Sequence, residues 1–300
     1  MAALPDMTHD ELLKSLPAET RNALMQRSDA AGLRHLAGHV GAIVLIGGLI
    51  AIGVPFWPLL LPIQGVLLVF LFTLQHECTH QTPFHSKSLN EIIGHASGFL
   101  IFQPYIWFRY FHLAHHRHTN DPARDPELLS GAKPETQHAY LWHVIGLHVL
   151  IGAAKLQIRN AFLDPREIYL PERVVPRVRL EARLMLTGCA ALLILAGPWL
   201  IWVWLLPLLL GQPFLRLYLL AEHGRCPHVA NMLENTRTTF TTRLVRFVAW
   251  NMPFHIEHHS APNVPFHHLP ALHRKMKAHL VSTSPGYVSF NRDYFGSLDG

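Results

Sequence analysis

The stretch that decides the fold is residues 35–80, HLAGHVGAIVLIGGLIAIGVPFWPLLLPIQGVLLVFLFTLQHECTH. From His35 to His76 it holds no Asp, Glu, Lys or Arg over 42 residues. One helical crossing of a bilayer needs about 20 apolar residues, so this stretch is long enough for two. Prolines mark its middle, where a tight reversal belongs: Pro55, Pro58 and Pro62. The stretch therefore predicts two membrane spans, at about 39–56 and 59–80.

A second uncharged tract runs from Leu184 to Leu215, with Pro198 near its centre. It predicts two further spans, at about 182–198 and 200–222, the second extending past the uncharged tract toward the polar side. The whole chain is 50% hydrophobic and 15% charged, with a mean hydropathy of +0.18. Soluble domains carry roughly 25% charged residues. The expected fold is an all-α integral membrane protein with four transmembrane helices arranged as two hairpins.

The positions of the basic residues predict the orientation of these hairpins. The 25 Lys and Arg fall as four in residues 1–38, twelve in 76–183 and nine in 216–300. The two proline-containing reversals hold none. Because basic residues concentrate on the cytoplasmic side of a membrane protein, both hairpins are expected to enter from the cytoplasm and return to it. Both termini are then cytoplasmic.

Two units follow from this topology. Residues 1–38 form a polar cytoplasmic segment, in which Thr8 and Glu11 have the spacing of a helix capping box. Residues 39–300 form the membrane domain, whose cytoplasmic cap comprises residues 81–181 and 223–300. Within the cap, two stretches suit helices lying at the headgroup level: Leu89 to Phe111 and Ala139 to Leu156.

Several classes of protein are disfavoured. No early apolar segment of the secretory type follows Met1. Cys78, Cys189 and Cys226 are too few and too dispersed for a disulfide framework. The net charge of +5 and pI near 9.3 fit a basic rim facing anionic lipid. No basic run with interleaved aromatic residues indicates a nucleic-acid partner.

Histidine is the most informative residue type, with 23 copies gathered in short clusters. The clusters use spacings of three and four residues, which put imidazoles on one face of a helix. Nine imidazoles stand out: His76, His80, His112, His115, His116, His223, His255, His258 and His259. One tetrahedral zinc takes at most four protein ligands, so nine imidazoles indicate two metal ions. Nitrogen ligands suit iron, copper, nickel or zinc.

These clusters resemble the histidine boxes of the membrane fatty-acid desaturases and their hydroxylase relatives. The family pattern, H-x(3-4)-H, H-x(2-3)-H-H and H/Q-x(2-3)-H-H, is matched in order by residues 76–80, 112–116 and 255–259. The tracts RYFHLAHHRHTNDP (109–122) and NMPFH (251–255) are similar to those of bacterial members. The resemblance covers about residues 40–275. It implies four spans, a cytoplasmic cap, two irons (Fe2+/Fe3+), O2 as co-substrate, an acyl-like substrate, and the nine histidines as metal ligands.

Polar residues near the boxes are candidates to support the ligands. Some desaturases have an Asn one turn before the lone histidine, where it holds a water on one iron; the matching residue here is Leu219. Asn251 or Glu222 are alternative substitutes for it. Four acids are candidates to orient ligand imidazoles: Glu77, Asp121, Asp125 and Glu257. His118, beside the second box, is expected to lie outside the ligand set.

An unactivated C–H bond requires a cofactor, since no side chain attacks it. The chain shows no cytochrome b5-like segment, no iron–sulfur ligand set and no G-x-G-x-x-G turn. An external electron donor of the ferredoxin, rubredoxin or cytochrome type is therefore expected. The expected protein is a non-haem di-iron oxidoreductase of the bacterial inner membrane, with its active site facing the cytoplasm, that desaturates a fatty-acyl or similar aliphatic chain.

Three alternatives stay open. In the first alternative, the chain belongs to the same family but catalyses hydroxylation or an oxidative decarboxylation that forms a terminal alkene. Residues 76–80 also match H-E-x-x-H, the motif of zinc metalloproteases, which leaves the second and third boxes unexplained. A metal transporter would place ionisable residues inside the spans, and here the histidine clusters lie outside them.

Overall fold

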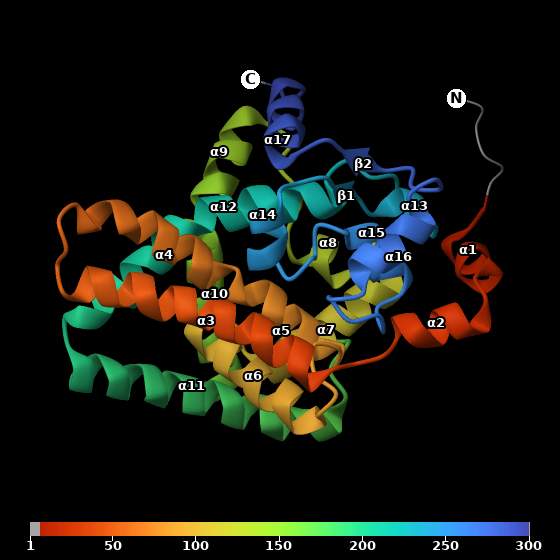
Figure 1. Ribbon diagram of the computed structural model, residues 1–300. Coiled ribbons are helices and arrows are strands. Elements are labelled where there is room, and N and C mark those ends of the chain that lie inside the picture. The colour runs from red at the N-terminus through yellow and green to blue at the C-terminus, as the bar shows by residue number, and fades with distance from the viewer. Residues whose placement is uncertain (1–6, 300) are drawn as a thin grey trace.

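The computed structural model describes residues 7–299, and residues 1–6 of the predicted N-terminal segment lie outside that range. The described chain is mostly helical (Figure 1). In chain order, the helices of the first half are α1 (His9–Ser15), α2 (Ala18–Leu24), α3 (Asp29–Ala51), η1 (Trp57–Leu59), α4 (Leu60–Val69), α5 (Leu71–Thr79), α6 (Lys87–Leu100), α7 (Tyr105–His118), α8 (Pro126–Ser130), α9 (Gln137–Ile145) and α10 (Leu147–Phe162).

The second half continues the helical pattern. Its elements are η2 (Glu172–Val174), α11 (Val175–Ala196), the π-helical turn η3 (Ile201–Leu205), α12 (Leu206–His223), α13 (Met232–Asn235), α14 (Arg243–Val248), α15 (His255–Ser260), α16 (Leu269–Met276) and α17 (Tyr287–Gly296). Two short parallel strands, β1 (Thr238–Thr239) and β2 (Thr283–Ser284), tie the cap together. The predicted capping box at Thr8 and Glu11 is confirmed at the start of α1.

Three helical segments are long and apolar enough to cross a membrane: Asp29–Ala51, Trp57–Thr79 and Ile201–His223. They correspond to the spans predicted at 39–56, 59–80 and 200–222. The first helix begins ten residues earlier than its predicted span, where the Ser28 side chain accepts a hydrogen bond from the backbone N–H of Ala31. This polar start of α3 reaches into the cap.

The remaining predicted span, 182–198, overlaps α11 from residue 182 to the end of the helix at Ala196. The helix has 22 residues, but it is not among the candidate spans of the described chain, and its first three turns carry Arg177, Arg179, Glu181 and Arg183. Its last turns are apolar and exposed, with Ile194 81% and Leu195 83% accessible. The four-span, two-hairpin topology therefore stays a prediction.

The two stretches predicted to lie at the headgroup level are both interrupted. Leu89 to Phe111 is divided between α6 and α7. The chain turns between the two helices, and Pro104 is the residue that precedes the first turn of α7. Ala139 to Leu156 is divided at Gly146 into α9 and α10, which meet at 59°. Together α9 and α10 are apolar enough to count as one broken span. Their placement at the headgroup level remains a prediction.

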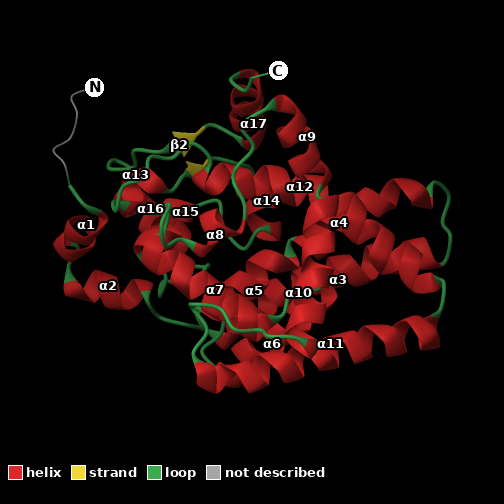
Figure 2. Cartoon of the chain, turned by 180° about the vertical axis from the view of Figure 1, so that it is seen from behind, coloured by secondary structure: helices red, strands yellow, loops and turns green. Residues whose placement is uncertain are grey.

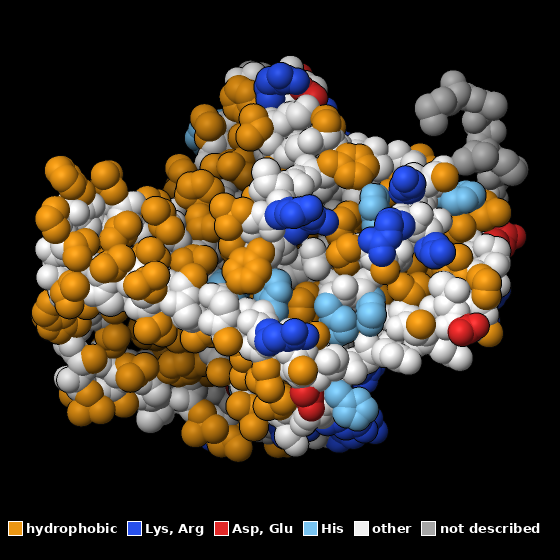
Figure 3. Space-filling view, viewed as in Figure 1, with side chains coloured by type: hydrophobic (Ala, Val, Ile, Leu, Met, Phe, Trp, Pro, Cys, Tyr) orange, Lys and Arg blue, Asp and Glu red, His pale blue; other side chains and the backbone are white. Residues whose placement is uncertain are grey.

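Both reversals between long helices lie at the same end of the molecule, as Figures 1 and 2 show from opposite sides. Phe56, in the α3–η1 reversal, is 80% accessible, and Trp199, between α11 and η3, is 58% accessible. In Figure 3, hydrophobic side chains cover this end, whereas Lys, Arg and His gather over the cap. Apolar surface of this extent is stable in lipid, which agrees with a membrane fold.

Two glycines let the central helices touch backbone to backbone. A Cβ on Gly65 of α4 would lie 2.3 Å from the carbonyl oxygen of Pro207, and a Cβ on Gly211 of α12 would lie 2.4 Å from the carbonyl oxygen of Gly65. Small residues at such crossings are typical of packed membrane helices, where close approach replaces the hydrophobic effect. The α4–α12 contact fixes two histidine-bearing segments relative to each other.

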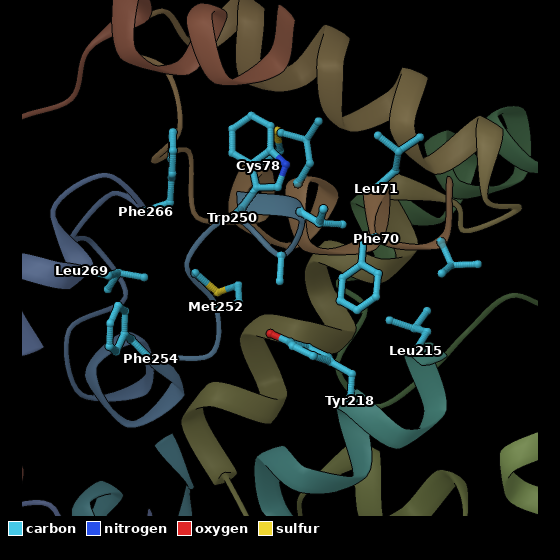
Figure 4. Packing of buried hydrophobic residues seen from close by; sticks show 14 of the residues in the cluster. Phe70, Leu71, Cys78, Leu215, Tyr218, Trp250, Met252, Phe254, Phe266 and Leu269 are labelled. Atoms are coloured by element: carbon cyan, nitrogen blue, oxygen red, sulfur yellow. The ribbon is translucent and has the colours of Figure 1, made fainter. Parts of the chain in front are cut away.

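The buried Trp250 connects the cap to the long helices by packing and by a hydrogen bond (Figure 4). Its indole N–H donates to Nδ1 of His39 in α3, at 3.1 Å, while Nε2 of His39 donates to the carbonyl oxygen of Leu67 in α4, at 2.9 Å. Trp250 and Asn251 both have left-handed backbone conformations, with φ of 50° and 58°. This tight turn immediately precedes α15 and directs it into the cap interior.

We expect Gly211→Val to lower the apparent melting temperature of the detergent-purified protein, because the added methyls overlap the backbone of α4. Overpacking of this kind costs about 1–3 kcal/mol or more. Gly41→Val is the matched control, since a Cβ there meets nothing within 4 Å. Equal melting temperatures for the two variants would contradict the close α4–α12 packing.

Candidate metal centre

The three histidine boxes and the lone histidine converge from four helices. The first box ends α5, the second lies in α7, the third forms α15, and His223 is the last residue of α12. All nine predicted ligands lie in one region of the cap, next to the ends of the long helices. Their nitrogens form two groups.

The first group has five imidazoles: His76, His80, His112, His116 and His258. One nitrogen from each lies within 4.8 Å of all the others. Inside the group, Nε2 of His80 is 2.8 Å from Nε2 of His112, and Nε2 of His258 is 3.2 Å from Nε2 of His116. The Nε2 atoms of four imidazoles therefore face one another.

The second group contains His115, His223 and His259, with one nitrogen of each again within 4.8 Å of the others. His255 joins them, because its Nε2 lies 3.1 Å from Nε2 of His223. The imidazole rings of His116 and His259 stack at 4.0 Å between centroids and join the two groups.

Helical geometry explains how the boxes are shared. In α7, His112 and His116 are four residues apart and belong to the first group, while His115 belongs to the second. In α15 the division is reversed, since His258 joins the first group and the four-residue pair His255 and His259 joins the second. Each H-x-x-H-H box thus contributes two imidazoles to one group and one to the other.

Burial keeps most of these imidazoles neutral. It holds the pKa of His80 at about 3 and the pKa values of His112, His116 and His258 well below the ordinary value. A neutral imidazole keeps one nitrogen lone pair for a cation. For His115, burial also lowers the pKa, but the nearby Glu127 and Asp125 outweigh it and raise the pKa overall.

Some of the nitrogens that face away from each group lie near polar side chains. Nδ1 of His115 donates to the carboxylate of Asp125 at 2.9 Å, and burial of Asp125 is outweighed by this contact, so the pKa of Asp125 is lowered. Nδ1 of His255 lies 3.3 Å from Glu222, and Nδ1 of His258 lies 3.6 Å from Glu77. The hydrogen bond to Asp125 orients the ring of His115 and leaves its Nε2 pointing inward. Glu222 and Glu77 lie near their imidazoles without a hydrogen bond to them.

The other three predicted supporting residues lie elsewhere. Asp121 caps a turn on the surface and pairs with Arg124. Asn251 occupies the left-handed turn before α15, where its amide donates to the carbonyl oxygen of Phe266. Glu257 faces away from both groups and accepts a hydrogen bond from Thr238.

Several supporting residues have no signature in the sequence. Nδ1 of His223 donates to the carbonyl oxygen of Asn235, and the Thr119 hydroxyl lies 3.2 Å from Nδ1 of His259. A backbone carbonyl and a threonine brought together by the fold leave no spacing pattern, so nothing along the chain could have identified them.

The donor set fits transition-metal ions. Within the described residues, buried imidazole nitrogens without a hydrogen-bond partner include Nδ1 of His76 and Nε2 of His259. Leaving such groups unpaired is unfavourable, whereas coordination to a shared cation satisfies them. All the converging atoms are nitrogens, which suit iron, copper, nickel or zinc rather than magnesium or calcium.

Comparison with known proteins identifies the family to which the chain belongs. The sequence profile of the family described as fatty acid desaturase matches residues 52–291. The chain belongs to the fatty acid desaturase family. The match includes all three histidine boxes and His223, so the resemblance inferred from those boxes is confirmed.

Individual desaturases are similar over shorter stretches. The chain is 39% identical over 70 residues to the omega-3 fatty acid desaturase, endoplasmic reticulum, of Vigna radiata var. radiata, covering 23% of this chain and 18% of the relative. It is 41% identical over 66 residues to the sn-1 acyl-lipid omega-3 desaturase (ferredoxin) of a Synechocystis species, covering 22% and 18%. It is 26% identical over 124 residues to the sn-1 oleoyl-lipid 12-desaturase of a Picosynechococcus species, covering 40% and 34%. The chain thus spans between 18% and 34% of the length of these desaturases.

The metalloprotease alternative is not supported by the position of Glu77. A zincin needs this carboxylate free to act as a general base. Here one oxygen accepts hydrogen bonds from the Thr82 hydroxyl at 2.9 Å and from the backbone N–H of Phe266 at 3.0 Å. The other oxygen faces His258. Glu77 therefore holds two parts of the desaturase cap together.

We expect Asp125→Asn to weaken metal binding by about 10- to 100-fold, because the amide no longer fixes the Nδ1 proton of His115. The measurement is metal retention against a chelator of graded concentration. Asp121→Asn is the matched control on the same loop, and its metal affinity should equal that of the wild type. If both variants retain metal equally, Asp125 does not orient a ligand.

Proposed function

We propose that this protein is an O2-dependent di-iron oxidoreductase of the membrane that desaturates a fatty-acyl or similar aliphatic chain. The observation that carries the proposal is the division of nine imidazoles, seven of them fully buried, into one group of five and one of four. Two metal ions with four or five nitrogen ligands each would account for every member. Membership of the fatty acid desaturase family favours iron as the metal.

In this proposal the nine histidines are the ligands. His76, His80, His112, His116 and His258 would hold one ion, and His115, His223, His255 and His259 the other. Bound iron would supply the reduction of O2 and the oxidising power that breaks an unactivated C–H bond. The tenth position, where some relatives have an Asn, is Leu219, and Glu222 is the nearby polar residue that faces a ligand.

Other residues around the two groups orient the ligand imidazoles and exclude water. Asp125 holds the Nδ1 proton of His115. The rings of Phe72 and Phe108 lie against His76 and His112, with centroids 6.3 Å and 5.5 Å apart. These aromatic walls keep water from the ligands and offer an apolar surface to a hydrocarbon chain.

An aliphatic substrate agrees with the surface of the membrane-facing end. An apolar pocket of about 410 Å³ opens between α3, α4, α11 and η3, with Gly47, Leu68 and Trp204 among its walls. It corresponds to the hollow below α3 in Figure 3. Relatives named acyl-lipid and oleoyl-lipid desaturases support an acyl substrate.

Two further parts of the proposal concern electrons and orientation. Relatives whose names specify ferredoxin support an external donor of that kind for this chain. The basic residues avoid both reversals, and the reversals lie at the end opposite the cap. This arrangement supports two hairpins entering from the cytoplasm of a bacterial inner membrane, with residues 39–300 as one membrane unit and the cap on the cytoplasmic side.

The test is metal content and turnover of detergent-purified protein produced with ample iron. We expect about two irons per chain in the wild type and clear depletion in His115→Ala, since the second group loses a ligand. His118→Ala is the matched control, because His118 lies in the same helix outside both groups. Aerobic reaction with a reduced ferredoxin and an acyl substrate should yield an alkene in wild type and control alone.

The outcomes separate the alternatives. An alcohol, or a terminal alkene with release of CO2, would move the chain to the hydroxylating or decarboxylating branch of the family. One zinc per chain, unaffected by loss of His115, would refute the di-iron proposal.

A further inference from the structure

Arg216 is a cation within α12 that forms no ion pair in the described part of the chain. Arg216 lies seven residues before His223 in a helix apolar enough to span the membrane. Its Nε is buried without a hydrogen-bond partner, and no carboxylate of the described residues lies within 4 Å of its guanidinium. Glu127 and Glu222 are the carboxylates whose charges act on it from farther away. Ionisable residues in spans are costly and mark functional sites.

Arg216 packs against the bend between α9 and α10. A Cβ on Gly146 would lie 2.6 Å from Cβ of Gln212 and 3.5 Å from Cγ of Arg216. Gly146 has a φ of 72°, so both its conformation and its contacts require glycine. The bend is therefore held directly over the arginine side chain.

The amino end of α10 opens at this bend without a side-chain cap. In the described structure, the backbone N–H groups of Leu147 and His148 have no assigned acceptor. The amino terminus of a 16-residue helix carries a partial positive charge, and its free N–H groups are suited to bind an anion.

Two imidazoles flank the bend. His143 of α9 and His148 of α10 have ring centroids 5.9 Å apart, and the charge of Arg216 acts on both. Both rings are half-buried; the His143 ring contacts the backbone of Arg216 and the His148 ring that of Trp142, and among the described residues Nε2 of His143 and Nδ1 of His148 have no hydrogen-bond partner. The Arg216 side chain and the free amino end of α10 thus meet at the bend, next to the two imidazoles.

The surroundings of this place are apolar. Around the bend, α9 and α10 carry exposed hydrophobic side chains: Leu141, Trp142, Ile145, Leu147 and Ile151. An anion that reaches Arg216 from this side arrives attached to a hydrocarbon chain. Arg216 is also about 10 Å along the helix axis from His223, two turns away on the same face.

We propose that the α9–α10 bend and Arg216 bind the anionic oxygen group of the lipid substrate. The substrate then carries a carboxylate or a phosphate, and this site sets how far along the chain the reacting carbon lies. The inference rests on the proposed oxidation of an aliphatic chain and names the class of that substrate. A carboxylate would come from a free fatty acid and a phosphate from an anionic phospholipid.

The test measures binding without turnover, on the full-length iron-loaded protein in detergent with no reductant. Radiolabelled palmitic acid is displaced by unlabelled palmitic acid or methyl palmitate, and by dipalmitoyl phosphatidylglycerol or dipalmitoylglycerol. Within one pair, we expect the charged ligand to compete about 10- to 100-fold more strongly than its neutral partner, the range for a charge-assisted hydrogen bond. Preference within the first pair identifies a fatty acid, and preference only within the second a phospholipid.

Variants locate the effect. Arg216→Gln should remove the preference for the charged ligand, and Arg216→Lys should retain part of it because the charge remains. Lys155→Gln is the matched control, an exposed cation on α10 away from the bend, and should bind like the wild type. Melting temperature and iron content report whether each variant is folded.

The proposal is overturned if charged and neutral ligands compete equally with the wild-type protein, a result that needs no variant. It is also overturned if folded Arg216→Gln keeps the full preference. Failure of the proposed function would look different. Absence of iron or of alkene would refute the oxidation, whereas a preference for the charged ligand that depends on Arg216 would still be measured.

Discussion

The structure depends on the convergence of imidazoles whose inward-facing nitrogens meet one another. Nine histidines from α5, α7, α12 and α15 bring their nitrogens together in a buried region. Buried polar atoms in this arrangement are unfavourable unless a cation is shared between them. Helix directions, turns and supporting hydrogen bonds in the cap all serve to maintain that arrangement.

Two kinds of packing hold the histidine-bearing helices at the required positions. Toward the membrane, Gly65 and Gly211 bring α4 and α12 into backbone contact, so that the ends of α5 and α12 stay at a fixed separation. Toward the cap, Trp250 bonds to His39 and the following left-handed turn directs α15 inward. The centre lies where these two packings meet, at the ends of the long helices.

Charge is distributed in the same way. The apolar end of the molecule is nearly free of ionisable groups, and the cap holds carboxylates placed behind individual imidazoles, such as Asp125 behind His115. Arg216 lies inside a candidate span, where it forms no ion pair with the described residues and packs against the bend at Gly146. A charged residue in this position points to a ligand that brings the opposite charge from outside the chain.

The sequence by itself determined the helical membrane class, the places of both reversals and the family, because long uncharged tracts and helical histidine spacing are local patterns. It also singled out all nine converging histidines. Only the tertiary structure decided how they divide into five and four, which carboxylates stand behind them, and that Asp121, Asn251 and Glu257 serve elsewhere. In the structure, the stretch predicted as one helix at 139–156 is divided into α9 and α10, and the bend between them packs against Arg216. The physical reason is that these features arise from contacts between segments far apart in the chain, and spacing along a sequence carries no information about which helix face meets which partner.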